Sequence, residues 1–246
     1  MVAIAEFLGQ GLYTPSEVAL YVRERPSLVA RWLLGKSCAP VIERQFTQES
    51  RFVTFLDFVQ VLAIATIRRQ FKVPLKIIRE GIEEARKRHK VDYPLAMQHT
   101  TYLFQREEQG ALANSISSAE EQDVRKFEMI IRRPNESLVL LTGQHRGHYV
   151  MKEIVELYLS DLSFDPAGLA IAYTAWRKDG LEIRMDPKKR FGEPRTPSGY
   201  TAYTLADAVK IEGSVELASK AYGADRTEVE LVVSYLDYLR IIPRRE

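Results

Sequence analysis

Apolar residues near the start of the chain recur at helical spacing in two short, neighbouring segments. Residues 14–23 predict a first helix, because Thr14 and Glu17 have the spacing of a capping box. This helix should end near residue 23, since Pro26 disfavours helical backbone at the residue before it. A second helix is predicted over residues 27–34. Two short helices joined by a turn of about three or four residues have the proportions of a helix-turn-helix, and equally those of an ordinary αα-hairpin.

A β-hairpin is predicted directly after this helix pair. Val41 and Ile42 are expected to pair with residues 52–55, with the polar residues 48–50 at the tip of the hairpin. In a winged helix-turn-helix, the wing occupies this place in the chain. The arginines beside the tip would then contact DNA phosphates; as an alternative, they are ordinary surface arginines.

Two longer helices are predicted next. Residues 55–70 are apolar on more than one face, which indicates a buried helix at the centre of the N-terminal part. Thr54 and Asp57 repeat the N-cap spacing at its start. Residues 75–90 are amphipathic, with charged residues on the outer face. The residues of this second helix that we expect to face inward are Leu75, Ile78, Ile82 and Ala85.

The middle of the chain has a mixed pattern. Residues 126–133 and 137–143 are strand-like, and residues 151–162 predict a helix. Residues 168–186 alternate on both sides of Asp179-Gly180, which is a strong hairpin signal. This region therefore predicts both helix and antiparallel strand.

The C-terminal part is helical again. Three short capped helices are predicted, opened by Thr204 and Asp207, by Ser214, and by Asp225 and Glu228. They would form a second unit of three helices, of helix-turn-helix type. Prolines in residues 187–200 discourage a helix there and predict extended chain.

Together these patterns predict an α+β fold that is mostly helical. The expected domains are a winged helix-turn-helix over residues 1–99, a mixed α/β connecting region with antiparallel hairpins over residues 100–186, and a trihelical domain over residues 187–246. Residues 1–90 contain 15 Lys and Arg against 9 Asp and Glu, a net charge of +6. Residues 91–246 contain 20 against 24, or −4, which gives +2 for the chain. A basic N-terminal part favours nucleic-acid binding.

Other classes of protein are poorly supported. No apolar run approaches the length of a transmembrane helix, so no membrane association is expected. The single Cys38 excludes an intramolecular disulfide and a cysteine-based metal cluster, and a reducing cytoplasm is the expected compartment. His145 and His148 have no evident third metal ligand, and neither a Gly-rich phosphate loop nor a nucleophile elbow occurs. We therefore expect no enzymatic activity, no metal and no cofactor.

Both ends of the chain resemble known families. The C-terminal part resembles a bacterial domain first catalogued as having unknown function, through Phe191-Gly192-Glu193-Pro194, Thr204, Glu212-Gly213-Ser214, residues 218–223 and residues 229–235. The N-terminal part resembles the MerR-like winged helix-turn-helix often fused ahead of that domain, through residues 13–19, 29–32, 55–59 and 73–79. Gly143-Gln144 and residues 161–165 fit the connecting region of such fusions.

The resemblance implies a VapB-like antitoxin of a type II toxin–antitoxin pair, whose toxin is a PIN-domain ribonuclease. Such antitoxins bind their own operator DNA and neutralise the toxin. Family members often have two basic residues before the tryptophan of the second helix. Here those positions are Ala30 and Arg31, so only Arg31 is carried over.

The residues predicted to contact DNA lie on the second helix, near the ends of the helix pair, beside the hairpin tip and early in the helix over residues 75–90. They are Arg23, Arg25, Ser27, Ala30, Arg31, Lys36, Arg44, Arg51 and Lys76. A helix-turn-helix protein usually binds two half-sites as a dimer, which predicts a homodimer. A speculative toxin-binding element consists of Arg240, Arg244 and Arg245.

Two other functions stay open. A MerR-like one-component regulator would sense a small molecule in the middle region, where Tyr149, Tyr158, Tyr173 and Trp176 could line a pocket. An orphan scaffold would bind protein partners only. A neighbouring reading frame for a small acidic PIN-like protein would favour the antitoxin, and its absence would favour the sensor.

Overall fold

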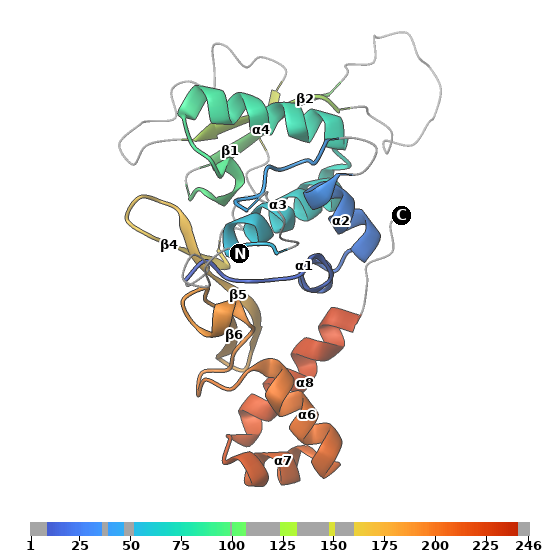
Figure 1. Cartoon of the computed structure of the whole chain (residues 1–246), viewed down its shortest axis with the longest axis vertical. Helices are drawn as coiled ribbons and strands as arrows, with labels where there is room; N and C mark the ends of the chain where they lie inside the picture. The colour runs from blue at the N-terminus through green and yellow to red at the C-terminus, as the bar shows by residue number, and fades with distance from the viewer. Residues whose placement is uncertain are drawn as a thin grey trace.

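The computed structural model of the chain describes residues 9–35, 39–46, 52–98, 100–106, 124–131, 148–150 and 160–240. Within these residues the fold is α+β and mostly helical, as predicted (Figure 1). Helix α4 and strands β1 and β2 lie at one end of the molecule and helices α6–α8 at the other, with α1 and α2 between them. Across the described ranges, no helix is both long enough and apolar enough to cross a membrane.

Helices α1 (Pro15–Val22) and α2 (Pro26–Leu34) confirm the first two predicted helices. Thr14 and Glu17 form the capping box at the start of α1. Arg23 then adopts left-handed backbone with φ of 57° and ends the helix. The turn is held from outside, because Arg69 donates a 2.9 Å hydrogen bond to the carbonyl oxygen of Val22. The pair is therefore fixed at its start and at its turn.

Helices α3 (Phe55–Phe71) and α4 (Leu75–His89) confirm the next two predictions. The capping box of Thr54 and Asp57 is present at the start of α3. Most of α3 is buried, as its apolar pattern predicts. In α4, the predicted inward residues Ile78, Ile82 and Ala85 are buried, and Leu75 is partly buried.

The predicted pairing of the wing hairpin is wrong. Val53 forms an isolated antiparallel bridge with Tyr13, through hydrogen bonds of 2.9 and 2.8 Å between their backbones. Val41 instead donates its N–H to the carbonyl oxygen of Trp32 at 2.8 Å. The backbone N–H and carbonyl of Val53, which the hairpin would have used, thus pair with Tyr13 in the segment ahead of α1. The predicted tip at residues 48–50 lies outside the described residues.

A first antiparallel sheet has the order β2-β1-β3, from β1 (Thr100–Arg106), β2 (Val124–Ile131) and β3 (His148–Val150). Its strand β2 lies against α4. Strand β2 confirms the strand predicted over residues 126–133, whereas β1 was not predicted. The predicted strand over residues 137–143 lies outside the described residues.

A second antiparallel sheet has the order β4-β5-β6, from β4 (Leu162–Phe164), β5 (Ala170–Lys178) and β6 (Leu181–Met185). The β5–β6 hairpin confirms the Asp179-Gly180 prediction, and both residues have positive φ, at 50° and 79°. The helix predicted over residues 151–162 is wrong at its last three residues, because residues 160–161 form a turn and Leu162 begins β4. Residues 151–159 lie outside the described residues.

Helices α6 (Ala202–Glu212), α7 (Val215–Tyr222) and α8 (Arg226–Arg240) confirm the three predicted C-terminal helices. The start of α6 was placed too late, because Thr201, not Thr204, is the N-cap and accepts the Thr204 N–H. Burial of Ala202, which is fully covered, favours the earlier start. Two short 3-10 turns, η2 (Pro94–Ala96) and η4 (Arg190–Gly192), complete the described helices, and η4 interrupts a segment predicted to be extended.

One buried cluster joins elements from all three predicted domains. The rings of Tyr21 and Tyr13 lie 6.1 Å apart, and Phe58 contacts both. Phe58 also lies 5.7 Å from Tyr173 of β5. Trp176, also on β5, donates its ring N–H to the hydroxyl of Ser234 on α8 at 2.9 Å. The N-terminal helices, the second sheet and α8 are therefore packed together around aromatic residues.

Candidate nucleic-acid interface

The face of α2 is set by residues at helical spacing. Trp32 is fully buried, and Val29 and Leu33 are buried beside it. This packing turns Ser27 and Arg31 to the exposed side of the helix, as predicted. Ala30 is partly exposed between them. The exposed side of α2 therefore presents a hydroxyl, a small side chain and a guanidinium.

The charge on this face is not neutralised within the described residues. Arg25, at the N-cap of α2, and Arg31, in its last turn, are both exposed. No described carboxylate forms an ion pair with either of them. The guanidinium N–H groups of such an exposed arginine can donate paired hydrogen bonds to phosphate oxygens or to a guanine edge. The arrangement can bind an anionic partner without first breaking an internal pair.

The side chain of Arg23 does not join this exposed face of α2 but contacts α8. Its guanidinium lies 4.0 Å from the ring centre of Tyr238 on α8, which is a cation–π contact. Through this contact, Arg23 links the turn after α1 to the C-terminal helix. It therefore joins the two ends of the chain and is not grouped with Arg31.

The residues predicted around the wing and α4 are mostly engaged locally. Arg44 donates a 3.0 Å hydrogen bond to the carbonyl oxygen of Phe52. Lys76 is exposed and lies 4.0 Å from Glu80 one turn along α4. Lys36 and Arg51 lie outside the described residues. The structure thus groups Arg25, Ser27, Ala30 and Arg31 at one helix, whereas the other described candidates, Arg23, Arg44 and Lys76, lie on separate elements.

The predicted toxin-binding residues are at the end of α8. Arg240 is exposed and lies 3.3 Å from Asp237. Arg244 and Arg245 lie outside the described residues. The more prominent feature of the C-terminal helices is apolar. Ile211 and Leu217 have exposed fractions of 76% and 51%, a chemistry that suits a protein surface.

The structure also reveals a basic loop that the sequence-based reasoning missed. Lys188, Lys189 and Arg190 follow β6 and are all exposed. Two adjacent residues of this loop, Arg190 and Phe191, have left-handed backbone with φ of 48° and 55°. Such conformations cost roughly 1–2 kcal/mol per residue with a side chain. A run of three consecutive basic residues was the signal available in the sequence.

The backbone of the basic loop is attached to the segment just before α1. Leu12 donates its N–H to the carbonyl oxygen of Phe191 at 2.9 Å. The buried Tyr13 hydroxyl donates to the carbonyl oxygen of Gly192, also at 2.9 Å. Burial raises the pKa of this hydroxyl well above its ordinary value, so it stays protonated and remains a donor. Residues far apart in sequence are thus held side by side.

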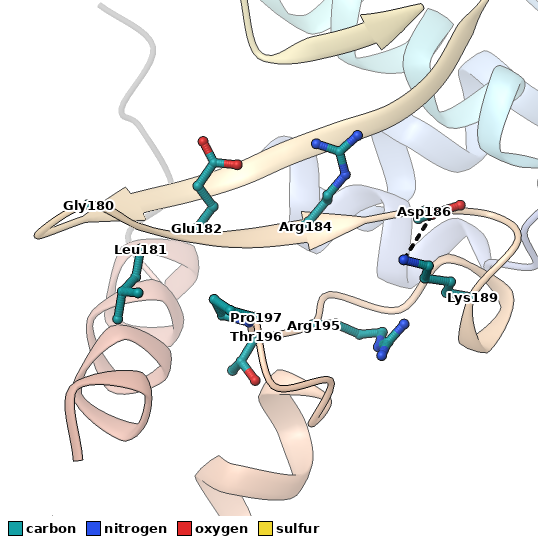
Figure 2. A pocket seen from close by; sticks show the side chains of 9 residues that line it. All are labelled: Gly180, Leu181, Glu182, Arg184, Asp186, Lys189, Arg195, Thr196 and Pro197. Carbon is teal, nitrogen blue, oxygen red and sulfur yellow. Dashed lines mark ion pairs between the residues drawn. The ribbon is translucent and has the colours of Figure 1, made fainter. Parts of the chain in front are cut away.

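A pocket of about 470 Å³ lies next to this loop, between β6 and residues 195–197 (Figure 2). It is lined by Gly180, Leu181, Glu182, Arg184, Asp186, Lys189, Arg195, Thr196 and Pro197. In Figure 2, Glu182 and Arg184 extend from the strand away from Thr196 and Pro197. The Thr196 hydroxyl is buried, and no described group hydrogen-bonds to it. No cluster of metal-ligating residues occurs here or elsewhere in the described residues.

The aromatic residues proposed for a sensor pocket are not found around this cavity. Tyr173 packs against Phe58, and Trp176 lies 4.5 Å from the ring of Tyr238. Both belong to the aromatic packing between the sheet and the helices. Tyr158 lies outside the described residues, and of Tyr149 only the backbone is described.

Comparisons with known proteins place the fold but not the activity. No protein-family model matches the chain, and no curated protein matches it. Among solved structures, the chain is similar to the X-ray crystal structure of Rv2018 from Mycobacterium tuberculosis, with a TM-score of 0.58 and 16% sequence identity. The similarity covers 92% of this chain and 99% of that chain. At this identity, the two proteins share the arrangement of their elements over nearly their whole length, and the likeness shows the fold alone.

Proposed function

We propose that the protein is a DNA-binding antitoxin of a type II toxin–antitoxin pair, which represses its own operon and neutralises a PIN-domain ribonuclease. The observation that carries this proposal is the α1–α2 pair. Its second helix is anchored by the buried Trp32 and exposes Arg25 and Arg31 without internal ion pairs among the described residues. In a helix-turn-helix, the second helix enters the major groove in this orientation.

Charge along the chain supports DNA as the partner of the N-terminal part. The net charge of +6 over residues 1–90 favours association with phosphates, whereas the remainder of the chain carries −4. Arg31 would read a base edge or a phosphate from the groove, and Arg25 would contact the backbone beside it. Two protomers would occupy two half-sites of the operator.

The toxin would be bound by the C-terminal helices. Ile211 and Leu217 expose apolar surface there, and Tyr222 adds a half-exposed ring. Apolar and aromatic side chains of this kind form the centres of protein interfaces. The resemblance of this part of the chain to VapB-like antitoxins supplies the class of partner, a PIN-domain ribonuclease.

The test is binding to the DNA upstream of the protein's own gene. Fluorescence anisotropy at several salt concentrations would compare wild type with Arg31→Ala and with Arg226→Ala, an exposed arginine that lies on α8. We expect Arg31→Ala to weaken binding by about 1–3 kcal/mol and Arg226→Ala to leave it unchanged. Weak binding that is indifferent to sequence and to Arg31→Ala would overturn the operator assignment.

The second candidate is a one-component regulator that senses a small molecule. The observation that favours it is the pocket beside the basic loop, with its buried Thr196 hydroxyl. The two candidates differ in their genomic setting and in their ligands. A neighbouring gene for a PIN-like protein that co-purifies with this chain supports the antitoxin; operator binding that changes with a small ligand and needs no such neighbour supports the regulator.

A further inference from the structure

We propose that the basic loop of Lys188, Lys189 and Arg190 is a second DNA contact, which binds the phosphate backbone beside the helix-turn-helix. This inference rests on the proposed function, because it names a further surface for the same partner. It concerns residues that belong to the C-terminal half of the sequence. The structure brings them to the N-terminal helices.

The position of the loop is set by its attachment to the residues that precede α1. The carbonyl groups of Phe191 and Gly192 accept hydrogen bonds from Leu12 and Tyr13, one or two residues before the Thr14 N-cap. Lys188 also lies close to the N-terminal segment, because a Cβ atom on Gly9 would be 3.9 Å from its side chain. In helix-turn-helix complexes the first helix crosses the DNA backbone. The loop is therefore held next to the helix that would lie along the phosphates.

The chemistry of the loop suits phosphate better than a base edge or a protein surface. Its three cations are consecutive and exposed, and Lys189 has one distant partner, Asp186 at 3.9 Å. Lysine acts as a point charge on phosphates, and such contacts carry no sequence information. Another basic residue nearby, Arg195, is already engaged, because its Nε donates a hydrogen bond to the carbonyl oxygen of Gly199 in the next turn.

The strained backbone supports a functional role for this turn. Arg190 and Phe191 both keep left-handed backbone, although neither is glycine. Strain of this kind persists where surrounding contacts hold it in place, and it concentrates at binding sites. Here the contacts that hold the turn include the hydrogen bonds from Leu12 and Tyr13, beside the backbone hydrogen bonds within the loop itself.

The test uses the full chain and compares two triple variants with wild type and with Arg31→Ala. The loop variant carries Lys188→Gln, Lys189→Gln and Arg190→Gln. The matched control carries Lys178→Gln, Lys210→Gln and Lys220→Gln, which removes the same charge from exposed positions on the β5–β6 hairpin, α6 and α7. Thermal unfolding of both variants checks that the fold is retained. Binding to upstream DNA and to an unrelated duplex is measured across a series of salt concentrations.

We expect the loop variant to bind both duplexes about tenfold more weakly. The slope of log K against log salt should fall by about 2.7 for each protomer bound if all three cations contact phosphates, since each phosphate contact contributes about 0.9. The DNA affinity of the control variant should fall by less than threefold. An unchanged slope in the loop variant, with Arg31→Ala still weakening binding, would overturn this inference and leave the proposed function standing. No DNA binding by wild type would overturn both proposals.

Discussion

The helix pairs α1–α2 and α7–α8 are joined by turns of the same kind but expose different charges. In each pair, a residue with left-handed backbone ends the first helix, Arg23 with φ of 57° and Gly223 with φ of 62°. The next N–H, of Glu24 or of Ala224, reaches back to a carbonyl of the preceding helix at 2.9 or 3.2 Å. The same kind of turn therefore joins both pairs, and the two pairs can be compared position by position around it.

Those side chains differ most at the exposed positions of the second helix. Matching the two turns pairs Arg25 with Asp225 and Ala30 with Glu230. Arg226, at the start of α8, is held by Glu216 and Glu230 at 2.9 and 2.7 Å. The second pair thus neutralises its own arginine and presents carboxylates, which phosphates repel. Of the two pairs, only α1–α2 therefore exposes arginines, Arg25 and Arg31, that form no ion pair among the described residues, which is the charge pattern that the proposed DNA binding requires.

The largest effect should come from the buried anchors of the two second helices. Trp32→Ala should cost about 3–5 kcal/mol of stability, because it empties a fully buried site. It should also remove DNA binding, since α2 loses the contact that fixes its orientation. Chemical denaturation and anisotropy would measure the two effects.

The matched change in the second pair is Val232→Ala, which also truncates a fully buried side chain. We expect a loss of about 2 kcal/mol and no change in DNA affinity, provided that the protein is assayed well below its unfolding midpoint. Equal losses of DNA affinity in both variants would show that the two pairs are not functionally distinct.

Exchange of charge at the matched turn positions should have the next largest effect. Arg25→Asp should weaken operator binding by about 1–3 kcal/mol, because it places a carboxylate beside a phosphate. Asp225→Arg should change DNA affinity by less than about threefold, since Glu230 and Glu216 remain nearby. Both values come from the same anisotropy titrations. A gain in affinity with Asp225→Arg similar to the loss with Arg25→Asp would refute the division of roles.

The exposed apolar residues of α7 test the other proposed partner, because here toxin binding should change and DNA binding should not. Leu217→Asp should weaken toxin binding by about 1–2 kcal/mol, because the side chain is half exposed and has only that part left to bury in a complex. Operator binding should not change. Calorimetry with the purified toxin would measure the first effect, and Lys220→Gln, on the same helix and exposed, changes the net charge by the same amount and is the control for charge. Toxin binding that responds equally to both changes would point to charge rather than apolar contact.

Local signals in the sequence predicted most of the helices and one hairpin. Thr14, Thr54 and Ser214 act as N-caps where predicted, because each cap depends only on the next few residues. Asp179-Gly180 turns the chain for the same reason. The exposure of Arg31 also followed from the sequence, since it is the neighbour of an apolar residue that must face inward.

Features that depend on distant residues were not predicted. Val53 was predicted to pair with Val41 and Ile42, and only the packed structure shows that it pairs with Tyr13. The contact of Arg23 with Tyr238 joins residues from opposite ends of the chain. The basic loop was visible as a run of cations, but its place beside α1 depends on contacts with Leu12 and Tyr13. Spacing within a segment carries no information on such pairings.

The smallest predicted effect tests how the first helix pair is joined to the basic loop. Tyr13→Phe removes the hydroxyl that binds the Gly192 carbonyl at 2.9 Å and leaves that carbonyl without its donor. Because the bond is buried, we expect a loss of about 1–2 kcal/mol in stability. DNA affinity should fall about two- to threefold, since the loop would lose one of its two attachments while all its charges remain.

The control lies in the other helix pair. Tyr200→Phe removes the corresponding kind of bond, from a tyrosine hydroxyl to the carbonyl oxygen of Tyr222 at 2.6 Å. That bond is exposed, so water replaces the lost donor, and the cost should be about 0.5 kcal/mol with no change in DNA affinity. Thermal unfolding and the salt series would measure both variants. If Tyr200→Phe weakened DNA binding as much as Tyr13→Phe, the α7–α8 pair would lie within reach of the DNA, and the contrast between the two pairs would not hold.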